Sequence, residues 1–392
     1  MARTVRSERA IPPLLKNLNE RTVLETIRAG APVSRAEISR RAGISKPTVS
    51  LALQSLLDAG LVREAEPEPG RPSYGAVFFE PVPDAALVLG LDLGARFVRG
   101  AICDLRGDVR ARQDVELQRS DPEGVLQTIA QLHRSLVDSV DGADGLVDGV
   151  VVGVPGVVEA GTGAIRVTHY RELEGHRLAE ELAERIGLDV TLENDINLAA
   201  LGEQWQGVAR GVDNFVFLSV GTGLGAGLVL GGELHRGENG AAGEVDYALV
   251  GVGQEVDPSA EGVSALAARL AAETVSAVAA PYDARAIFAA ARSGDAVAQE
   301  VVAEVARRIA LHVAPISSVA DVALVVLGGG LGANGDLLLE PVRSLLGEWL
   351  PYPPRVEISS LGEAAVLSGA LAVGLRSALD NVFANRTRAS RA

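Results

Sequence analysis

The sequence predicts an α/β body of two related lobes that follows a small, mainly helical domain at the N-terminus. Three observations predict this arrangement. Short apolar runs typical of strands alternate with helical stretches over most of the chain. A cluster of strands followed by a glycine-rich turn occurs twice along this region, which suggests two related lobes. The first 60 residues instead repeat apolar side chains at helical spacing.

Length and composition limit the class of protein. A chain of 392 residues is long enough for two or three domains, and 47% hydrophobic against 22% charged residues excludes a wholly disordered protein. The single cysteine, Cys103, excludes an intramolecular disulfide and a cysteine-rich zinc module. No signal-type apolar region follows Met1, and no stretch is long and apolar enough to span a membrane. We therefore expect a soluble cytoplasmic protein with no membrane partner.

Charge is distributed unevenly along the chain. The formal net charge of −15 argues against a protein that coats nucleic acid with its whole surface. Residues 1–50, however, hold ten Arg or Lys and four Glu, a net charge of +6, so the other 342 residues carry −21. A basic head on an acidic body suggests that only the head meets a polyanion. A merely solvated basic end is the alternative that charge alone leaves open.

The N-terminal region has the pattern of a helix-turn-helix. A first helical repeat is broken at residues 31–33. Ser34 and Glu37 then form a capping box for a short second helix that ends near Gly43. Ser45 caps a third helix, which has a proline in its first turn and ends at a glycine, residue 60. The apolar residues that we expect to be buried are Val23, Leu24, Ile27, Val49, Leu53, Leu56 and Leu57.

Two short strands after the third helix predict a wing. They cover residues 61–66 and 76–79, and the turn between them contains Gly70-Arg71-Pro72, whose single guanidinium suits a minor groove. A plain linker turn is the alternative. The three helices and the wing together predict a winged helix-turn-helix domain over residues 1–82, with its third helix in the major groove of double-stranded DNA. The residues expected to contact operator DNA are Arg35, Arg40, Arg41, Ser45, Lys46, Thr48, Ser50, Gln54 and Arg71.

The body begins near residues 82–83 and alternates strands with helices. Strands are expected at residues 86–93, 98–103, 109–117, 147–154, 190–192, 214–220 and 322–327. Helices are expected near residues 122–140 and 179–186, after residue 197, and within residues 262–317.

The motifs of the body, in their order and spacing, resemble those of the ROK family (repressors, open reading frames, kinases) of the actin-like sugar-kinase superfamily. They are Gly90-Leu-Asp-Leu-Gly, Gly153-Val-Pro-Gly, Glu193-Asn-Asp-Ile-Asn, Gly221-Thr-Gly-Leu-Gly-Ala-Gly, Ala242-Gly-Glu, Gly328-Gly-Gly, Gly362-Glu-Ala-Ala-Val and Gly369-Ala. The resemblance covers residues 12–380 and includes the winged-helix head of the family's regulators, which its kinases lack. It implies an actin-like, ribonuclease-H-like fold. The domains expected are the head (1–82), a small lobe (83–196 plus 365–380), a larger lobe (197–364) and a C-terminal tail (381–392).

The resemblance also implies a sugar site between the two lobes. Asn194 and Asp195 would contact sugar hydroxyls, and the aspartate equivalent to Asp195 is the catalytic base of the family's kinases. A carboxylate at a strand end beside a helix start can accept from two hydroxyls and be held ionised by backbone amides. The residues alone would favour a turn with a helix cap. Glu244, Tyr247 and Glu261 complete the expected ligand-binding set.

The first phosphate loop departs from the family's kinases. Ala95, Arg96 and Phe97 stand where those kinases have glycine, threonine and lysine, and a Cβ at Ala95 crowds a backbone that should approach phosphate closely. The second loop keeps its glycines, but we favour a remnant glycine-rich hairpin over a nucleotide site. We therefore expect no ATP cofactor. The residual nucleotide-binding residues would be Gly94, Gly221, Thr222, Gly223, Gly328 and Gly329.

The family's zinc motif, a Gly-His followed by three cysteines, is absent. Tyr247 stands at the histidine position, and no cysteine follows Cys103. A tetrahedral site of nitrogen and sulfur ligands cannot be assembled there, so we expect no metal. The family's histidine also contacts sugar, and Asp246 and Tyr247 would have to supply replacement hydrogen bonds.

Two main classes of function remain open. We expect a transcriptional repressor whose body binds a sugar or sugar derivative and thereby changes operator affinity. The alternative is an ATP-dependent sugar kinase with Asp195 as base, alone or combined with regulation, and a third possibility is a regulator that answers to a protein partner. An operator-reading head favours a homodimer or a dimer of dimers, with third helices about 34–36 Å apart.

Overall fold

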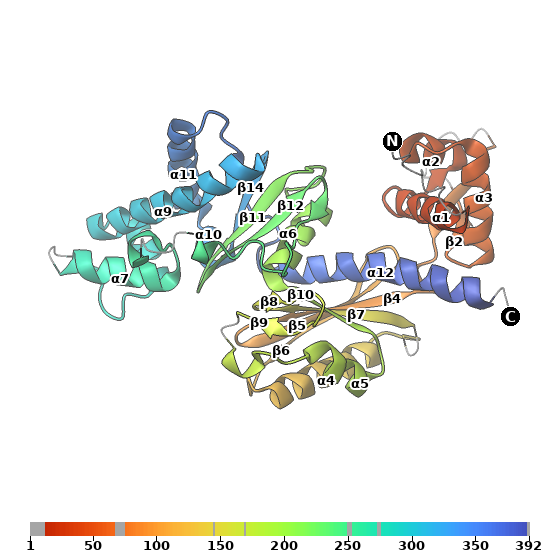
Figure 1. The fold of residues 1–392 in the computed structure, drawn as a ribbon, viewed down its shortest axis with the longest axis horizontal. Coiled ribbons are helices and arrows are strands. Elements are labelled where there is room, and N and C mark those ends of the chain that lie inside the picture. The colour runs from red at the N-terminus through yellow and green to blue at the C-terminus, as the bar shows by residue number, and fades with distance from the viewer. Residues whose placement is uncertain are drawn as a thin grey trace, which may run out of the picture.

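The computed structural model describes residues 12–66, 75–143, 146–167, 170–248, 253–272 and 276–389. They form a small N-terminal domain, called the head, and a body of two lobes, each built on a five-stranded sheet (Figure 1). Among the helices of the described residues, none is long and apolar enough to cross a lipid bilayer.

The head is a winged helix-turn-helix, as the sequence predicts. Ser34 caps the second helix by accepting from the Glu37 amide at 3.4 Å, and Ser45 caps the third by accepting from the Thr48 amide at 3.4 Å. Gly43 closes the second helix in the left-handed region, with φ of 67°. The three strands form a sheet in the order β1-β3-β2. In chain order the elements are α1 (Pro12–Arg28), β1 (Val33–Ser34), α2 (Arg35–Ala42), α3 (Lys46–Asp58), β2 (Val62–Ala65) and β3 (Phe78–Pro81).

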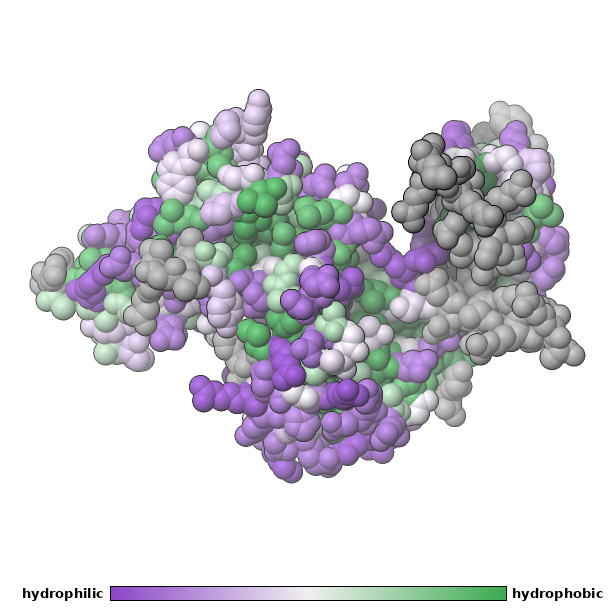
Figure 2. All heavy atoms as spheres, viewed as in Figure 1, coloured by the Kyte–Doolittle hydropathy of each residue, from purple (hydrophilic) through white to green (hydrophobic). Residues whose placement is uncertain are grey.

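The small lobe has the strand order β10-β7-β4-β5-β6. Strands β4, β7 and β10 are parallel, so their carboxyl ends meet at one edge of the sheet. Two helices, α4 and α5, cover one face, and the charged strand β6 and these helices give this side of the molecule its hydrophilic surface (Figure 2). The elements are β4 (Leu87–Leu93), β5 (Phe97–Asp104), β6 (Val109–Glu116), α4 (Pro122–Asp138), β7 (Val147–Val154), β8 (Val157–Val158), β9 (Ile165–Arg166), α5 (Leu178–Ile186) and β10 (Val190–Asn194).

The large lobe has the strand order β13-β12-β11-β14-β15. Its largest apolar core lies between one face of this sheet and the helices α7, α8, α9 and α11 (Figure 1). The elements are β11 (Phe215–Val220), β12 (Leu224–Leu230), β13 (Glu233–Leu234), α7 (Ala260–Ala271), α8 (Ala284–Arg292), α9 (Ala296–Ala320), β14 (Leu324–Gly328), α10 (Gly329–Gly332), α11 (Gly335–Trp349) and β15 (Arg355–Ile358).

Two helices cross between the lobes. Helix α6 (Asp195–Trp205) packs on the inner face of the large-lobe sheet, and α12 (Ala365–Ala389) packs on the small-lobe sheet. Glycines allow the two helices to touch, because a Cβ at Gly369 would overlap the backbone of Leu198. Glu203 on α6 is fully buried and accepts from the Val208 amide at 2.9 Å and from the Ser359 hydroxyl at 2.5 Å. This carboxylate therefore fixes the end of α6 to the segment that precedes α12.

One expected glycine-rich turn is largely a strand. The sequence suggests a turn at residues 221–227, whereas strand β12 already begins at Leu224. The glycines serve packing instead, since a Cβ at Gly227 would lie 2.7 Å from the carbonyl oxygen of Ile196 on α6. Helix α12 also continues to Ala389, past residue 380.

The head is attached to the small lobe through the β5–β6 turn. Leu105 in this turn is fully buried in the apolar core of the head, and its amide donates to the Pro83 carbonyl at 3.0 Å. Arg106 forms an ion pair with Glu80 at the end of the wing strands. The β5–β6 turn is therefore part of the small lobe, while its Leu105 side chain is part of the core of the head.

Candidate functional site

The exposed side chains of α3 include two residues predicted to contact DNA and one that was not predicted. Lys46 and Gln54 are exposed, and so is Leu51, with 75% of its surface accessible. Leu51 was not expected from the sequence, but an apolar side chain at such a position is suited to a thymine methyl group. Gln54 donates to Asp58 at 2.8 Å within the helix.

The three hydroxyl groups predicted for DNA contact form hydrogen bonds within the helix. Ser45 and Thr48 share a hydrogen bond of 2.8 Å at the cap of α3. Ser50 donates to the Lys46 carbonyl at 2.9 Å. These groups stabilise the start of α3, whether or not they also contact a base.

The arginines of α2 are all exposed, but they differ in their contacts. Arg35 and Arg40 lie at the surface of the head, with Arg40 3.7 Å from Glu37. Arg41 binds the buried Glu37 carboxylate at 2.5 Å and lies against Gly30, where its guanidinium occupies the space of a Cβ. Arg41 therefore has a structural role in the head. Arg71 of the wing lies outside the described residues.

The polar residues predicted in the body meet at the carboxyl edge of the small-lobe sheet. Asp92 on β4 and Asn194 on β10 flank the end of β7 in the parallel register. Asn194 is the N-cap of α6, because its Oδ1 accepts from the Asn197 amide at 2.9 Å. Its Nδ2 donates to the Gly156 carbonyl at 3.0 Å. Most of the hydrogen-bonding capacity of Asn194 thus holds the site together.

Asp195 starts α6 and is the most perturbed carboxyl of the site. Burial, together with the nearby Asp92 carboxylate and Glu244, raises its pKa to about 7, against the amides of Ile196 and of Asp195 itself. Burial likewise raises the pKa of Asp92 to about 6, against the Arg99 guanidinium at 3.3 Å. We call Asp92, Asp195 and Glu244 the carboxylate cluster. Such a cluster of acceptors can bind several hydroxyl donors.

The loop that carries Glu244 lies against the start of α6. Gly243 accepts from the Ala226 amide at 2.8 Å, and Gly225 of the same strand packs on Ile196. This explains why Glu244 acts electrostatically on Asp195 from the other lobe. Tyr247 and Glu261 are exposed, and neither forms a hydrogen bond with Asp195 in the described part of the chain. Their predicted role in ligand binding stays a prediction.

An ion pair that sequence reasoning missed joins the two lobes beside this cluster. The buried Glu193 on β10 accepts from Nε of Arg236, which follows β13, at 2.6 Å. The other Glu193 oxygen accepts from the Asn194 amide at 3.0 Å and from the Asn197 side chain at 2.9 Å. No local signal in the sequence marks this pair, because its partners lie 43 residues apart.

The two glycine-rich loops of the predicted nucleotide site lie at different places. Gly221–Gly223 and Gly328–Gly329 come together in the large lobe, at the adjacent ends of β11 and β14. Gly94 lies in the small lobe, where its carbonyl accepts from the Tyr170 hydroxyl at 2.9 Å. The Arg96 guanidinium lies over the Phe97 ring at 5.2 Å and pairs with Glu116 at 3.6 Å. The Arg96 guanidinium of the first loop is therefore paired with the last residue of strand β6.

The residues at the family's zinc position do not fit a zinc ion. Val245, Asp246 and Tyr247 form a short 3-10 turn there, and no cysteine follows Cys103. Within the described ranges, no group of three or more His, Cys, Asp or Glu side chains is arranged to hold a metal.

Comparison with known proteins finds two families along the chain. The sequence profile of the ROK family matches residues 88–376, which is more than half of the chain and the whole core of the body. The profile of the MarR family matches residues 17–72, within the winged-helix head.

Similar proteins include regulators and kinases. A putative xylose repressor of Caldicellulosiruptor sp. (strain Rt8B.4) is 26% identical over 92% of this chain and 96% of its own length. A glucokinase of Streptomyces coelicolor is 30% identical, over 72% of this chain and 96% of its own.

Two solved structures show the same architecture. A ROK family transcriptional regulator, described as a homolog of the E. coli MLC protein, superposes with a TM-score of 0.80 at 23% identity, over 94% of this chain and 98% of that one. A ROK hexokinase from Thermus thermophilus superposes with a TM-score of 0.63 at 28% identity, over 75% of this chain and 99% of its own. The fold is therefore the actin-like fold with a winged-helix head.

Proposed function

This chain belongs to the ROK family, and we propose that it is a repressor that binds operator DNA through its head and changes its affinity when a neutral sugar binds its body. The observation that carries the proposal is a continuous structural connection. Helix α6 begins in the carboxylate cluster and ends against the β5–β6 turn, which is embedded in the head. A ligand site and a DNA-binding domain are thus joined through one helix.

The chemistry of the cluster favours an uncharged polyhydroxyl ligand. Asp195 and Glu244 come from different lobes and act on one another, so hydroxyl donors between them would relieve the repulsion of two carboxylates. An anionic ligand would add to that repulsion. The curated relatives named as xylose repressors and glucokinases make xylose and glucose the first sugars to test.

Sugar binding would favour one arrangement of the lobes. The ligand would draw Glu244 toward Asp195 and thus hold the lobes together, beside the existing Glu193–Arg236 pair. A ligand shifts such an equilibrium only by the difference between its affinities for the two states. In a two-fold assembly this shift would change the separation of the two α3 helices, which a palindromic operator requires to be about 34–36 Å.

The direct test is an operator-binding measurement. DNA from upstream of the protein's own coding sequence is titrated with the full chain, in the absence and presence of xylose or glucose. We expect a complex that one of the sugars weakens at least fivefold, with the response lost in Asp195→Asn. A chain that binds none of this DNA, or whose binding no sugar changes, would contradict the proposal.

One observation favours kinase activity as a second candidate. A carboxyl whose pKa is about 7, as at Asp195, suits a general base that accepts a hydroxyl proton near neutral pH. The first phosphate loop opposes this candidate, because Ala95 brings a Cβ and Arg96 is bound to Glu116. Release of ADP with xylose or glucose that disappears in Asp195→Asn would establish the kinase, and no release would remove it.

A further inference from the structure

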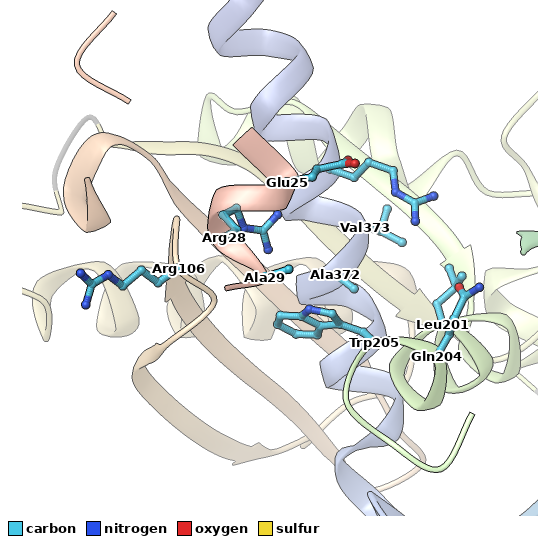
Figure 3. A pocket seen from close by; sticks show the side chains of 10 residues that line it. Glu25, Arg28, Ala29, Arg106, Leu201, Gln204, Trp205, Ala372 and Val373 are labelled. Carbon is cyan, nitrogen blue, oxygen red and sulfur yellow. The ribbon is translucent and has the colours of Figure 1, made fainter. Parts of the chain in front are cut away.

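A cavity lies between the head and the body, away from the carboxylate cluster (Figure 3). Its volume is about 350 Å³, which lies within the range of small-molecule sites. Helix α1 of the head, the β5–β6 turn, and helices α6 and α12 of the body each contribute to its wall. The residues that define its character are Arg28, Arg106, Gln204, Trp205, Val373 and Arg376.

Arg28 is the unusual member of this wall. The residue is half-buried, and its Nε, which is shielded from solvent, has no hydrogen-bond partner among the residues that the structure describes. Burial lowers the pKa of Arg28 from its ordinary value, which reflects the loss of hydration around the cation. An unpaired buried cation is costly, because nothing replaces the water that it loses.

Two carboxylates act on Arg28, namely Glu25, which itself lines the cavity, and Asp104, and both are engaged with other groups. Glu25 binds Arg21 at 3.2 Å. Asp104 accepts from the Arg106 amide at 2.9 Å and from the Arg110 guanidinium at 3.3 Å. Neither carboxylate therefore neutralises Arg28 by a direct hydrogen bond, and an external oxyanion is the group that this position lacks.

The other residues of the cavity wall include apolar side chains beside the arginines. The cavity is therefore suited to a ligand that has an anionic group and an apolar or neutral carbon skeleton. The Trp205 indole lines the same cavity as Arg28 (Figure 3), and Val373 of α12 adds an apolar surface. Arg376 also lines the cavity and is only loosely paired, at 3.7 Å from Glu233. Arg106 points away from Arg28 in Figure 3 and is bound to Glu80, so we assign it no ligand contact.

We propose that this cavity is a second ligand site, which binds a small oxyanion, a phosphate ester or a carboxylate, through Arg28. The planar guanidinium can donate to two oxygens of such a group at once. Trp205 and Val373 cover the carbon skeleton. The bound anion contacts α1 of the head together with α6 and α12 of the body, and therefore strengthens the docking of the head.

The site differs in charge from the carboxylate cluster. Its wall holds three arginines and one carboxylate, Glu25, and therefore attracts an anion, whereas Asp195 and Glu244 repel one, so the two sites select different ligands. The proposal therefore does not depend on the repressor function, and anion binding can be measured without DNA.

The experiment measures binding to the full chain by calorimetry and thermal shift in a phosphate-free buffer. The probes are inorganic phosphate, glucose 6-phosphate and gluconate, with glucose as the neutral reference. We expect at least one of the three anions to bind with a millimolar or tighter Kd. Binding of phosphate and glucose 6-phosphate but not of gluconate would identify a phosphate site. Binding of gluconate alone would identify a carboxylate site.

Variants then assign the site. Arg28→Gln should weaken anion binding at least tenfold and leave the Tm of the unliganded chain at or above that of the parent protein, since it removes an unpaired buried charge. Arg28→Lys keeps the charge, loses Nε and should weaken binding less. Arg134→Gln, an exposed arginine on α4, should bind the anions as the parent protein does. The proposal is overturned if no anion binds, if Arg28→Gln and Arg28→Lys both bind normally, or if Arg134→Gln weakens anion binding as much as Arg28→Gln does.

Discussion

Trp205 at the end of α6 lies against Gly107 in the β5–β6 turn, where a Cβ atom would come within 2.9 Å of the indole Cζ2. Gly107 has a φ of +94°, a conformation that favours glycine, so the close approach and the backbone both require this residue. The adjacent Leu105 is buried in the core of the head. Because α6 also begins at Asp195, a helix of 11 residues joins the carboxylate cluster to the support of the head.

Trp205→Ala should therefore still bind sugar and operator DNA, but sugar should no longer weaken its binding to the operator. Coupling between two sites typically amounts to about 5–150-fold in affinity. We expect the sugar-induced change of operator affinity to fall below about threefold in the variant, because α6 no longer presses on the turn. Operator affinity without sugar and sugar affinity without DNA should stay close to those of the parent protein. Fluorescence anisotropy with labelled operator and calorimetry with sugar measure the two quantities.

Trp349→Ala provides the matched control for this experiment. Trp349 is partly exposed at the end of α11 in the large lobe, far along the chain from the turn. It should respond to sugar as the parent protein does. An undiminished sugar response in Trp205→Ala would show that the signal does not pass through α6.

Sugar affinity should rise with pH around neutrality. The pKa of Asp195 is raised to about 7, so this carboxyl is mostly protonated at pH 6 and ionised at pH 8. The ionised form accepts two hydroxyl hydrogens, whereas the protonated form loses part of that capacity. We expect about a tenfold gain in affinity across this range, measured by calorimetry. A flat profile, or one that persists in Asp195→Asn, would mean that another group controls binding.

The same carboxyl should destabilise the unliganded chain above neutral pH. Its pKa is about 7 in the folded state and close to 4 in the unfolded state, so the folded state holds more protons between these values. Stability is therefore lost as pH rises toward 7 and stays lost above it. Asp195→Asn should raise the free energy of unfolding by about 1–2 kcal/mol at pH 8. This figure is reduced to allow for the solvent that reaches the half-buried carboxyl. At pH 5 the variant should raise the free energy of unfolding only slightly. Urea unfolding at the two pH values checks this, and a less stable variant at pH 8 would refute it.

Local signals in the sequence predicted the local structure well. Ser34 and Ser45 cap their helices as expected, because a cap depends on residues within one turn of the helix. The strands expected between residues 86 and 220 and at 322–327 also follow from local periodicity, whereas strand β15 and helices α11 and α12 were not expected. The glycine-rich turn expected at residues 221–227 is shorter than that, because strand β12 begins at Leu224 and its glycines make room for α6, a contact that no local pattern reveals.

The candidate site was predictable only in part. Asp195 and Glu244 were named from motifs, but the pKa of Asp195 depends on Asp92, a residue 103 positions earlier that the fold brings onto the same sheet edge. Glu203 likewise binds Ser359, 156 residues further along the chain. Such pairs are fixed by tertiary packing, so a single sequence carries no signal for them.

Gln54 should contribute more to operator specificity than to general DNA affinity. It is exposed on α3, and an amide side chain can form two hydrogen bonds with adenine in the major groove. Gln54→Ala should weaken specific operator binding by about 1–3 kcal/mol and leave non-specific binding nearly unchanged. Gln127→Ala, an exposed glutamine on α4, should change neither. Titration of operator and of unrelated DNA at one salt concentration makes the comparison, and an equal loss on both DNAs would assign Gln54 to the phosphate backbone.

Arg236→Gln should destabilise the contact between the lobes. The variant leaves the buried Glu193 carboxylate without the guanidinium that now lies 2.6 Å away, while the hydrogen bonds from Asn194 and Asn197 to its other oxygen remain. Removal of one partner of a fully buried pair costs about 3–5 kcal/mol, and the partial exposure of Arg236 should reduce the loss to about 1–3 kcal/mol. Arg177→Gln breaks an exposed pair with Glu180 and should cost less than about 0.5 kcal/mol. Urea unfolding compares the two variants, and equal losses would show that the Glu193–Arg236 pair contributes no more than a surface ion pair does.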